Sequence, residues 1–150
     1  MEAAAVDFDC VLGDTRALWE AWLVDVSRRL RLGPLELPHD RADAASALDA
    51  RVGNWRVLLE RFAEEHAPVF LRPDAATSAA LRQLAGAGVR LGAFTDAPEP
   101  LARVAAAHLG AARRLERLEA GAGAFERLVE HLGADAVVVR TRAELSRLAG

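Results

Sequence analysis

The 150-residue chain contains no lysine, no isoleucine and no tyrosine, so all 19 of its basic side chains are arginines. We attribute this bias to codon usage, although it matters wherever chemistry favours a lysine. The formal net charge of -3 excludes the basic surface that nucleic-acid-binding proteins carry. No apolar run approaches the roughly 18 residues of a membrane-spanning helix, so we expect no membrane partner.

Cysteine is almost as scarce, because Cys10 is the single one. An internal disulfide is therefore excluded, and a reducing compartment is favoured. The amino-terminal residues also lack the basic segment and apolar core of a signal peptide. These observations predict a cytoplasmic protein. Hydrophobic residues make up 52% of the chain, which is enough for one folded domain without a covalent staple.

Apolar runs and helical patterns alternate along much of the chain. Four runs are typical of buried strands: Ala3–Phe8, Val89–Phe94, Ala111–Leu115 and Ala136–Val139. The third could equally be helical. Helices are predicted at Asp74–Gly86, Pro98–Gly110, Ala124–Leu132 and Thr141–Leu148. This alternation favours an α/β fold with a short parallel sheet.

Residues 15–72 break the alternation and predict a helical insert after the first strand. Apolar residues recur at helical spacing from Leu18 to Leu30, and two further helices are expected at Asp40–Arg51 and Trp55–His66, with Pro68 ending the last. We expect Trp19 and Trp22 to be buried there, although the insert could also hold a homodimer face. The predicted domains are a core of residues 1–14 and 73–150 and an insert of residues 15–72.

Two aspartates follow the first predicted strand. Asp7 and Asp9 are two positions apart, so on an extended segment their side chains point the same way. Aspartate is a poor strand residue, and ligands of parallel sheets bind beyond the carboxyl ends of strands. The pair is therefore a candidate site, with turn capping as the alternative. Asp14 and Thr15 are better explained as caps of the first insert helix.

The stretch VDFDCVLGDT resembles the first motif of the haloacid dehalogenase-like (HAD) superfamily, which is Asp-x-Asp-Gly-Thr-Leu followed by Asp-Ser or Asp-Thr. The helical insert lies where that family carries a small helical cap. The segment GVRLGAFTDAPEP is similar to the second motif, a Thr or Ser at a strand end, which maps onto Thr95. The resemblance thus implies a Rossmann-like (HAD-like) sheet with a helical cap.

The resemblance also implies a mechanism for hydrolysing a small phosphorylated metabolite. Asp7 is expected to attack phosphorus, and Asp9 to protonate the leaving oxygen and then activate water. Thr95 and Asp96 are expected at the phosphate, although a capping box with Glu99 explains Asp96 better. Asp7 and Asp9 would also be ligands of Mg²⁺.

The third and fourth HAD motifs are degenerate. Ala122 stands where the family has a lysine, and Arg140 and Thr141 stand where it has Gly-Asp. Thr141 and Glu144 are explained as a capping box. Mg²⁺ would lack its third acid, so we expect it to bind poorly if at all.

These losses leave two hypotheses for function. In the first, the chain is a HAD-like hydrolase of weak or altered activity, in which Arg140 pairs with Asp7 or Asp9 and supplies the charge of the metal; the alternative for Arg140 is that it points into solvent. In the second, the chain is a non-catalytic HAD-like binding or interaction protein. A metal-free dehalogenase is a third possibility, but that branch lacks the second aspartate of the first motif.

Overall fold

The computed structural model describes all residues from Met1 to Gly150. Its centre is a parallel sheet in the order β3-β2-β1-β4. The strands, in chain order, are β1 (Ala3–Asp7), β2 (Arg90–Thr95), β3 (Arg117–Ala120) and β4 (Val137–Val139). The predicted α/β fold with a short parallel sheet is confirmed. No helix is long and apolar enough to cross a bilayer.

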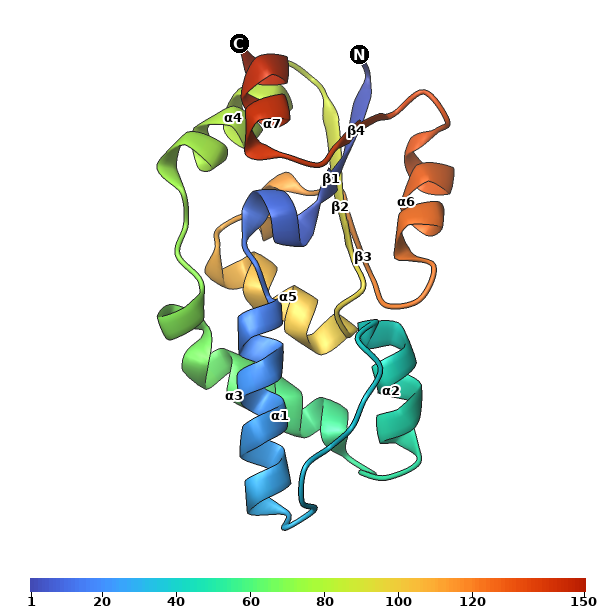
Figure 1. Cartoon of the computed structure of the whole chain (residues 1–150). Helices are drawn as coiled ribbons and strands as arrows, with labels where there is room; N and C mark the ends of the chain where they lie inside the picture. The colour runs from blue at the N-terminus through green and yellow to red at the C-terminus, as the bar shows by residue number, and fades with distance from the viewer.

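Helices cover both faces of the sheet (Figure 1). Alternate residues of β1 face opposite sides, so Ala4 and Val6 join the main core with α4 (Ala75–Gly86), α5 (Glu99–His108) and α7 (Arg142–Ala149). Ala3 and Ala5 face α6 (Ala124–Leu132) on the other side. Gly92 allows α6 to approach, because a Cβ there would collide with the side chain of Leu128.

Three helices, α1 (Arg16–Arg29), α2 (Arg41–Asp49) and α3 (Trp55–Phe70), follow the first strand and lie beyond the carboxyl ends of the strands (Figure 1). We call residues 15–72 the helical insert. Trp19, Trp22 and Trp55 pack together there with ring centroids 5.4–6.4 Å apart. Trp19 and Trp22 are 2% and 1% exposed, which confirms the burial expected from their spacing.

Two local predictions are wrong. For the run Ala111–Leu115 the strand alternative is wrong and the helical one is nearer, because Ala112–Arg114 form a 3₁₀ turn and the third strand begins at Arg117. As an edge strand, β3 pairs only with β2 and needs no continuous apolar run, so its Arg-Leu-Glu-Ala sequence gave little signal. Pro68 does not end α3 either. The helix loses one hydrogen bond at this proline but continues to Phe70, because its last turn is anchored by buried Ala67 and Leu71.

Candidate active site at the carboxyl edge of the sheet

The sheet brings the predicted site residues to one cavity. Asp7 ends β1 and Thr95 ends the neighbouring β2, while Asp9 lies on a single π-helical turn, η1 (Phe8–Leu12), that follows β1. The cavity measures about 310 Å³. It is lined by residues 121–125, which lead into and begin α6, and by Asp7, Asp9, Asp40, Ala42, Phe94, Thr95 and Asp96. Parallel strands end at a common edge, which is why residues far apart in sequence meet there.

Asp9 is held by four hydrogen bonds. Its Oδ1 accepts from the backbone N–H of Thr15 at 2.9 Å and from the Thr15 hydroxyl at 2.5 Å. Its Oδ2 accepts from the Thr95 hydroxyl at 2.6 Å and from Arg41 Nη2 at 3.0 Å. The Thr15 hydroxyl therefore binds Asp9. The prediction that Thr15 caps α1 is wrong, because its side chain makes no capping hydrogen bond. Asp14 does bond the start of that helix, through the N–H of Arg16.

Arg41, at the first position of α2, is the central cation of the site. Its side chain is only 1% exposed. Besides Asp9, its guanidinium donates to both Oγ1 of Thr15 at 2.7 Å and Oδ1 of Asp96 at 2.9 Å. A single side chain of the helical insert thus bonds residues that follow β1 and β2. A guanidinium suits this position because it offers several donors in a fixed planar fork.

Asp96 belongs to the same network. Its Oδ1 accepts from Nε of Arg41 at 3.1 Å, its Oδ2 accepts from the backbone N–H of Arg41 at 3.1 Å, and Arg16 Nη2 lies 3.5 Å from Oδ2. Burial favours a higher pKa for Asp96, but the hydrogen bonds and charge of Arg41 outweigh it and lower the pKa. The preferred explanation of Asp96 as a cap of α5 is wrong: α5 starts after Pro98 and has no side-chain cap.

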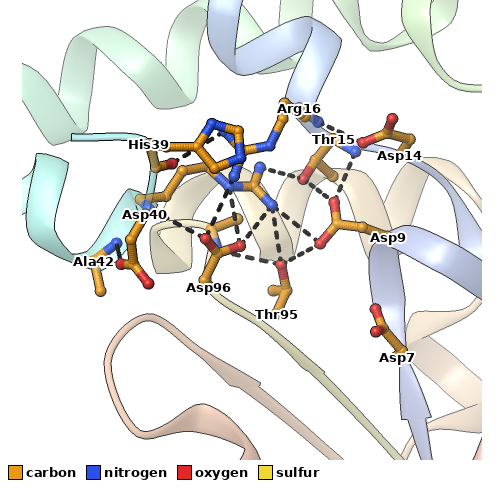
Figure 2. Close-up of polar contacts among 12 residues, drawn as sticks. Asp7, Asp9, Asp14, Thr15, Arg16, His39, Asp40, Ala42, Thr95 and Asp96 are labelled. Carbon is orange, nitrogen blue, oxygen red and sulfur yellow. Dashed lines mark hydrogen bonds and ion pairs between the residues drawn. The ribbon is translucent and has the colours of Figure 1, made fainter. Parts of the chain in front are cut away.

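Asp7, by contrast, lies apart from this network (Figure 2). Its Oδ1 accepts one long hydrogen bond, from the N–H of Cys10 at 3.4 Å, and its Oδ2 lies 3.7 Å from Nη1 of Arg140. The Arg140 guanidinium also stands over the rings of Phe94 and Phe125, at 5.6 and 5.4 Å from their centroids. Arg140 thus turns toward Asp7, rather than away into solvent, and leaves most lone pairs of Asp7 free.

The loop between β3 and α6 supplies no cation to the cavity. Ala122 lies in the cavity wall, and the guanidinium of Arg127 bonds the carbonyl oxygens of Ala120 and Ala122 together with Glu119. At the end of β4, Thr141 caps α7 through the N–H of Glu144, and Glu144 in turn accepts from the N–H of Arg140. The carboxylate of Glu144 is therefore occupied with helix capping.

The oxygen atoms that line this cavity do not fit a Mg²⁺ ion. Magnesium requires near-octahedral coordination by about six oxygens, usually including carboxylates. All four acceptor positions of Asp9 are taken by hydrogen-bond donors, and Asp7 faces the positive Arg140. Asp40, the other aspartate of the cavity wall outside the Arg41 network, uses one carboxylate oxygen to cap α2. No group of three or more acidic, histidine or cysteine side chains is arranged to hold a metal.

Millimolar MgCl₂ is expected to leave the melting temperature of the protein unchanged, because a ligand stabilises the folded state only in proportion to its occupancy. Differential scanning fluorimetry against matched NaCl measures this. Asp7→Asn, which removes the carboxylate at the end of β1, is the control. A magnesium-dependent rise that Asp7→Asn abolishes would show that the site does hold the metal.

Sequence reasoning missed Arg41 and Arg16, although Arg41 carried a signal. It stands in the first turn of α2, where the helix dipole disfavours a positive charge. A cation at such a position indicates carboxylates nearby. Its partners could not be identified from the sequence, because they follow two different strands.

Comparison with known proteins identifies the fold of the chain but no related sequence. No protein-family model matches the chain, and no curated protein matches it. Two solved structures superpose on its whole length. A β-phosphoglucomutase-like protein of Thermotoga maritima has a TM-score of 0.58 at 19% identity, with 82% of that chain covered. A HAD phosphatase of Thermococcus onnurineus has a TM-score of 0.56 at 17% identity, with 98% of that chain covered. The chain thus has a HAD-like fold.

Proposed function

We propose that this chain is a HAD-like hydrolase that removes the phosphoryl group from a small phosphorylated metabolite, with weak or altered activity. One observation carries the proposal. The open carboxylate of Asp7 lies at the carboxyl edge of a parallel sheet, in the wall of a cavity of about 310 Å³ that Thr95 and Asp9 also line. The fold it shares with a HAD phosphatase supports the same reaction class.

Asp7 is the nucleophile in this proposal. A carboxylate that attacks phosphorus divides one difficult displacement into two easier steps, through an aspartyl phosphate. The position of Asp7 favours attack because only one long hydrogen bond and a contact of 3.7 Å to Arg140 engage it. Its neighbour Asp9, with all four hydrogen-bond positions filled, is far less available.

Arg140 would supply the positive charge at the phosphoryl group. Its side chain is 56% exposed, so some of its donors are free to meet phosphoryl oxygens beside Asp7. The two phenylalanine rings hold the guanidinium in place, since a cation is attracted to the face of an aromatic ring. Thr95 and Asp96, the residues proposed at the phosphate, line the cavity, but Arg41 already occupies part of their hydrogen-bonding capacity. A weaker phosphate site, and so a weaker activity, is the consequence.

A panel of phosphate esters and acetyl phosphate, assayed with and without Mg²⁺, tests the proposal. We expect slow release of phosphate that Asp7→Asn reduces to the background rate. Asp135→Asn is the matched control, because Asp135 is exposed and precedes β4 at the opposite edge of the sheet. Phosphate release that persists in Asp7→Asn would reject the assignment of the nucleophile.

A second candidate is a non-catalytic protein that binds a phosphorylated ligand or a protein partner. The saturated hydrogen bonding of Asp9 favours it, because a carboxylate in this state stabilises the attachment of the insert more readily than it transfers protons. Isothermal titration calorimetry separates the two. Binding of inorganic phosphate without turnover of any ester supports the second candidate, whereas turnover that depends on Asp7 supports the first.

A further inference from the structure

We infer that the substrate is a phosphorylated compound whose leaving group departs as an anion, such as an acyl phosphate, rather than an alkyl phosphate ester. The inference rests on the proposed hydrolase function and adds the class of substrate. It follows from the state of Asp9, the carboxylate beside the nucleophile. An alkyl phosphate needs a proton on its leaving oxygen, and Asp9 is the group positioned to give one.

The contacts of Asp9 are all ones in which its carboxyl oxygens accept a hydrogen bond. A carboxylate offers about four lone-pair positions, and in Asp9 donors fill all of them. The backbone N–H of Thr15 and the Arg41 guanidinium can only donate, and the two hydroxyls donate as well. The Thr95 hydroxyl receives the N–H of Ala97 at 3.1 Å, and the Thr15 hydroxyl receives Nη1 of Arg41 at 2.7 Å, so both direct their own hydrogens to Asp9. Asp9 is therefore an acceptor toward all four partners.

Releasing Asp9 from Arg41 would cost about as much as acid catalysis contributes. Arg41 is 1% exposed, and removing one partner from such a buried pair is unfavourable by a factor of roughly 10² to 10⁴. A positioned general acid typically accelerates a reaction by roughly 10²–10⁴. The two factors cancel, so opening the pair brings no net gain. A substrate that needs no acid reacts without opening it.

The reaction then uses Asp7 alone as the reacting side chain. An oxygen of Asp7 forms a bond to phosphorus while the bond from phosphorus to the leaving oxygen breaks, and that oxygen keeps the electron pair and departs as an anion. Water next attacks the phosphorus of the aspartyl phosphate. The bond to Asp7 breaks, the carboxylate is restored, and the proton of the water passes to solvent. No oxidant, reductant or further reactant is required.

A pair of aryl phosphates of similar shape measures the dependence on the leaving group. p-Nitrophenyl phosphate releases a weakly basic anion, and phenyl phosphate releases a strongly basic one. We expect kcat/KM to be about 100-fold or more higher for p-nitrophenyl phosphate, since no acid compensates for the poorer leaving group. Acetyl phosphate should be hydrolysed readily, and glycerol phosphate hardly at all. Similar rates across this series would overturn the inference.

Asp9→Asn tests whether Asp9 acts as an acid. We expect it to lower the two aryl phosphate rates by the same factor, leaving their ratio unchanged. A selective loss of phenyl phosphate hydrolysis would identify Asp9 as a general acid and overturn the inference. Arg41→Met is the converse variant. It removes the guanidinium that bonds Asp9, so we expect the ratio of kcat/KM for p-nitrophenyl phosphate to that for phenyl phosphate to become smaller. Arg90→Met is its control, because Arg90 is an exposed partner of Glu116 at the start of β2.

Circular dichroism establishes that each variant is folded, and if Arg41→Met is not, Asp9→Asn alone decides. Failure of the inference differs from failure of the proposed function. Hydrolysis that depends on Asp7 but barely on the leaving group overturns the inference alone. If no substrate, acetyl phosphate included, is hydrolysed in an Asp7-dependent way, both are overturned.

Discussion

Arg41→Met is expected to lower the free energy of unfolding by about 3–5 kcal/mol, because it removes the cation from a buried ion-pair network and leaves carboxylates unpaired. Arg41 is almost fully buried and bonds Asp9, Asp96 and Thr15. Urea denaturation followed by tryptophan fluorescence measures the change. The control is Arg103→Met, whose arginine is 52% exposed and pairs with Glu60 and Glu99. It should cost at most about 1 kcal/mol.

The ion pair between Arg41 and Asp96 also makes the free energy of unfolding depend on pH. Arg41 lowers the pKa of Asp96 below the ordinary value of 3.8, so the ionised carboxylate contributes stability at pH values above about 4. This contribution is lost as the pH falls through the lowered pKa. In Arg41→Met the acid-dependent loss should be smaller, since the pKa of Asp96 returns toward its ordinary value. Equal loss in both proteins between pH 4 and pH 2 would show that Arg41 does not carry the effect.

Trp22→Ala is expected to lower the free energy of unfolding by about 3–5 kcal/mol through loss of apolar contact and formation of a cavity. Trp22 is 1% exposed and packs against Trp19 and Trp55 at centroid distances of 5.4 and 6.0 Å. Thermal unfolding followed by far-ultraviolet circular dichroism measures it. Val24→Ala on the same helix is the matched control, because Val24 is 59% exposed. A change in the free energy of unfolding no larger than that of Val24→Ala would show that the tryptophan cluster contributes little to the stability of the insert.

The parts of the fold that the sequence predicted are those whose signal is local. β1, β2 and β4 are short apolar runs, and the helices of the insert show apolar residues at helical spacing. The third strand carries no such signal, because two of its four residues are charged: Arg117 and Glu119 bond side chains of α6 instead of packing as apolar residues. Pro68 gave a misleading signal, since packing of Ala67 and Leu71 outweighs one lost hydrogen bond.

The candidate site could be predicted only in part, for a related reason. Asp7, Asp9 and Thr95 lie at strand ends, and the carboxyl edge of a parallel sheet brings strand ends together whatever the rest of the chain does. Arg41 comes from a helix of the insert, and its position depends on how that helix packs. That packing is set by side chains distant in sequence, so no local sequence motif predicts it. Arg140 was expected near the aspartates because it follows an apolar strand and so lies at the same edge of the sheet as Asp7, and the structure places β4 beside β1.

The order of strands in the sheet also bears on how quickly the chain can fold. Both neighbours of β1 come from far along the chain, since Ala3 pairs with Arg90 and Ala4 pairs with Val137. The entire helical insert must therefore be synthesised and bridged before either pairing forms, and pairing across such separations slows folding because the loop must close first. The tryptophan contacts of α1 and α3 span much shorter stretches. We therefore expect the helices of the insert to gather early and the sheet that carries the aspartates to be completed last.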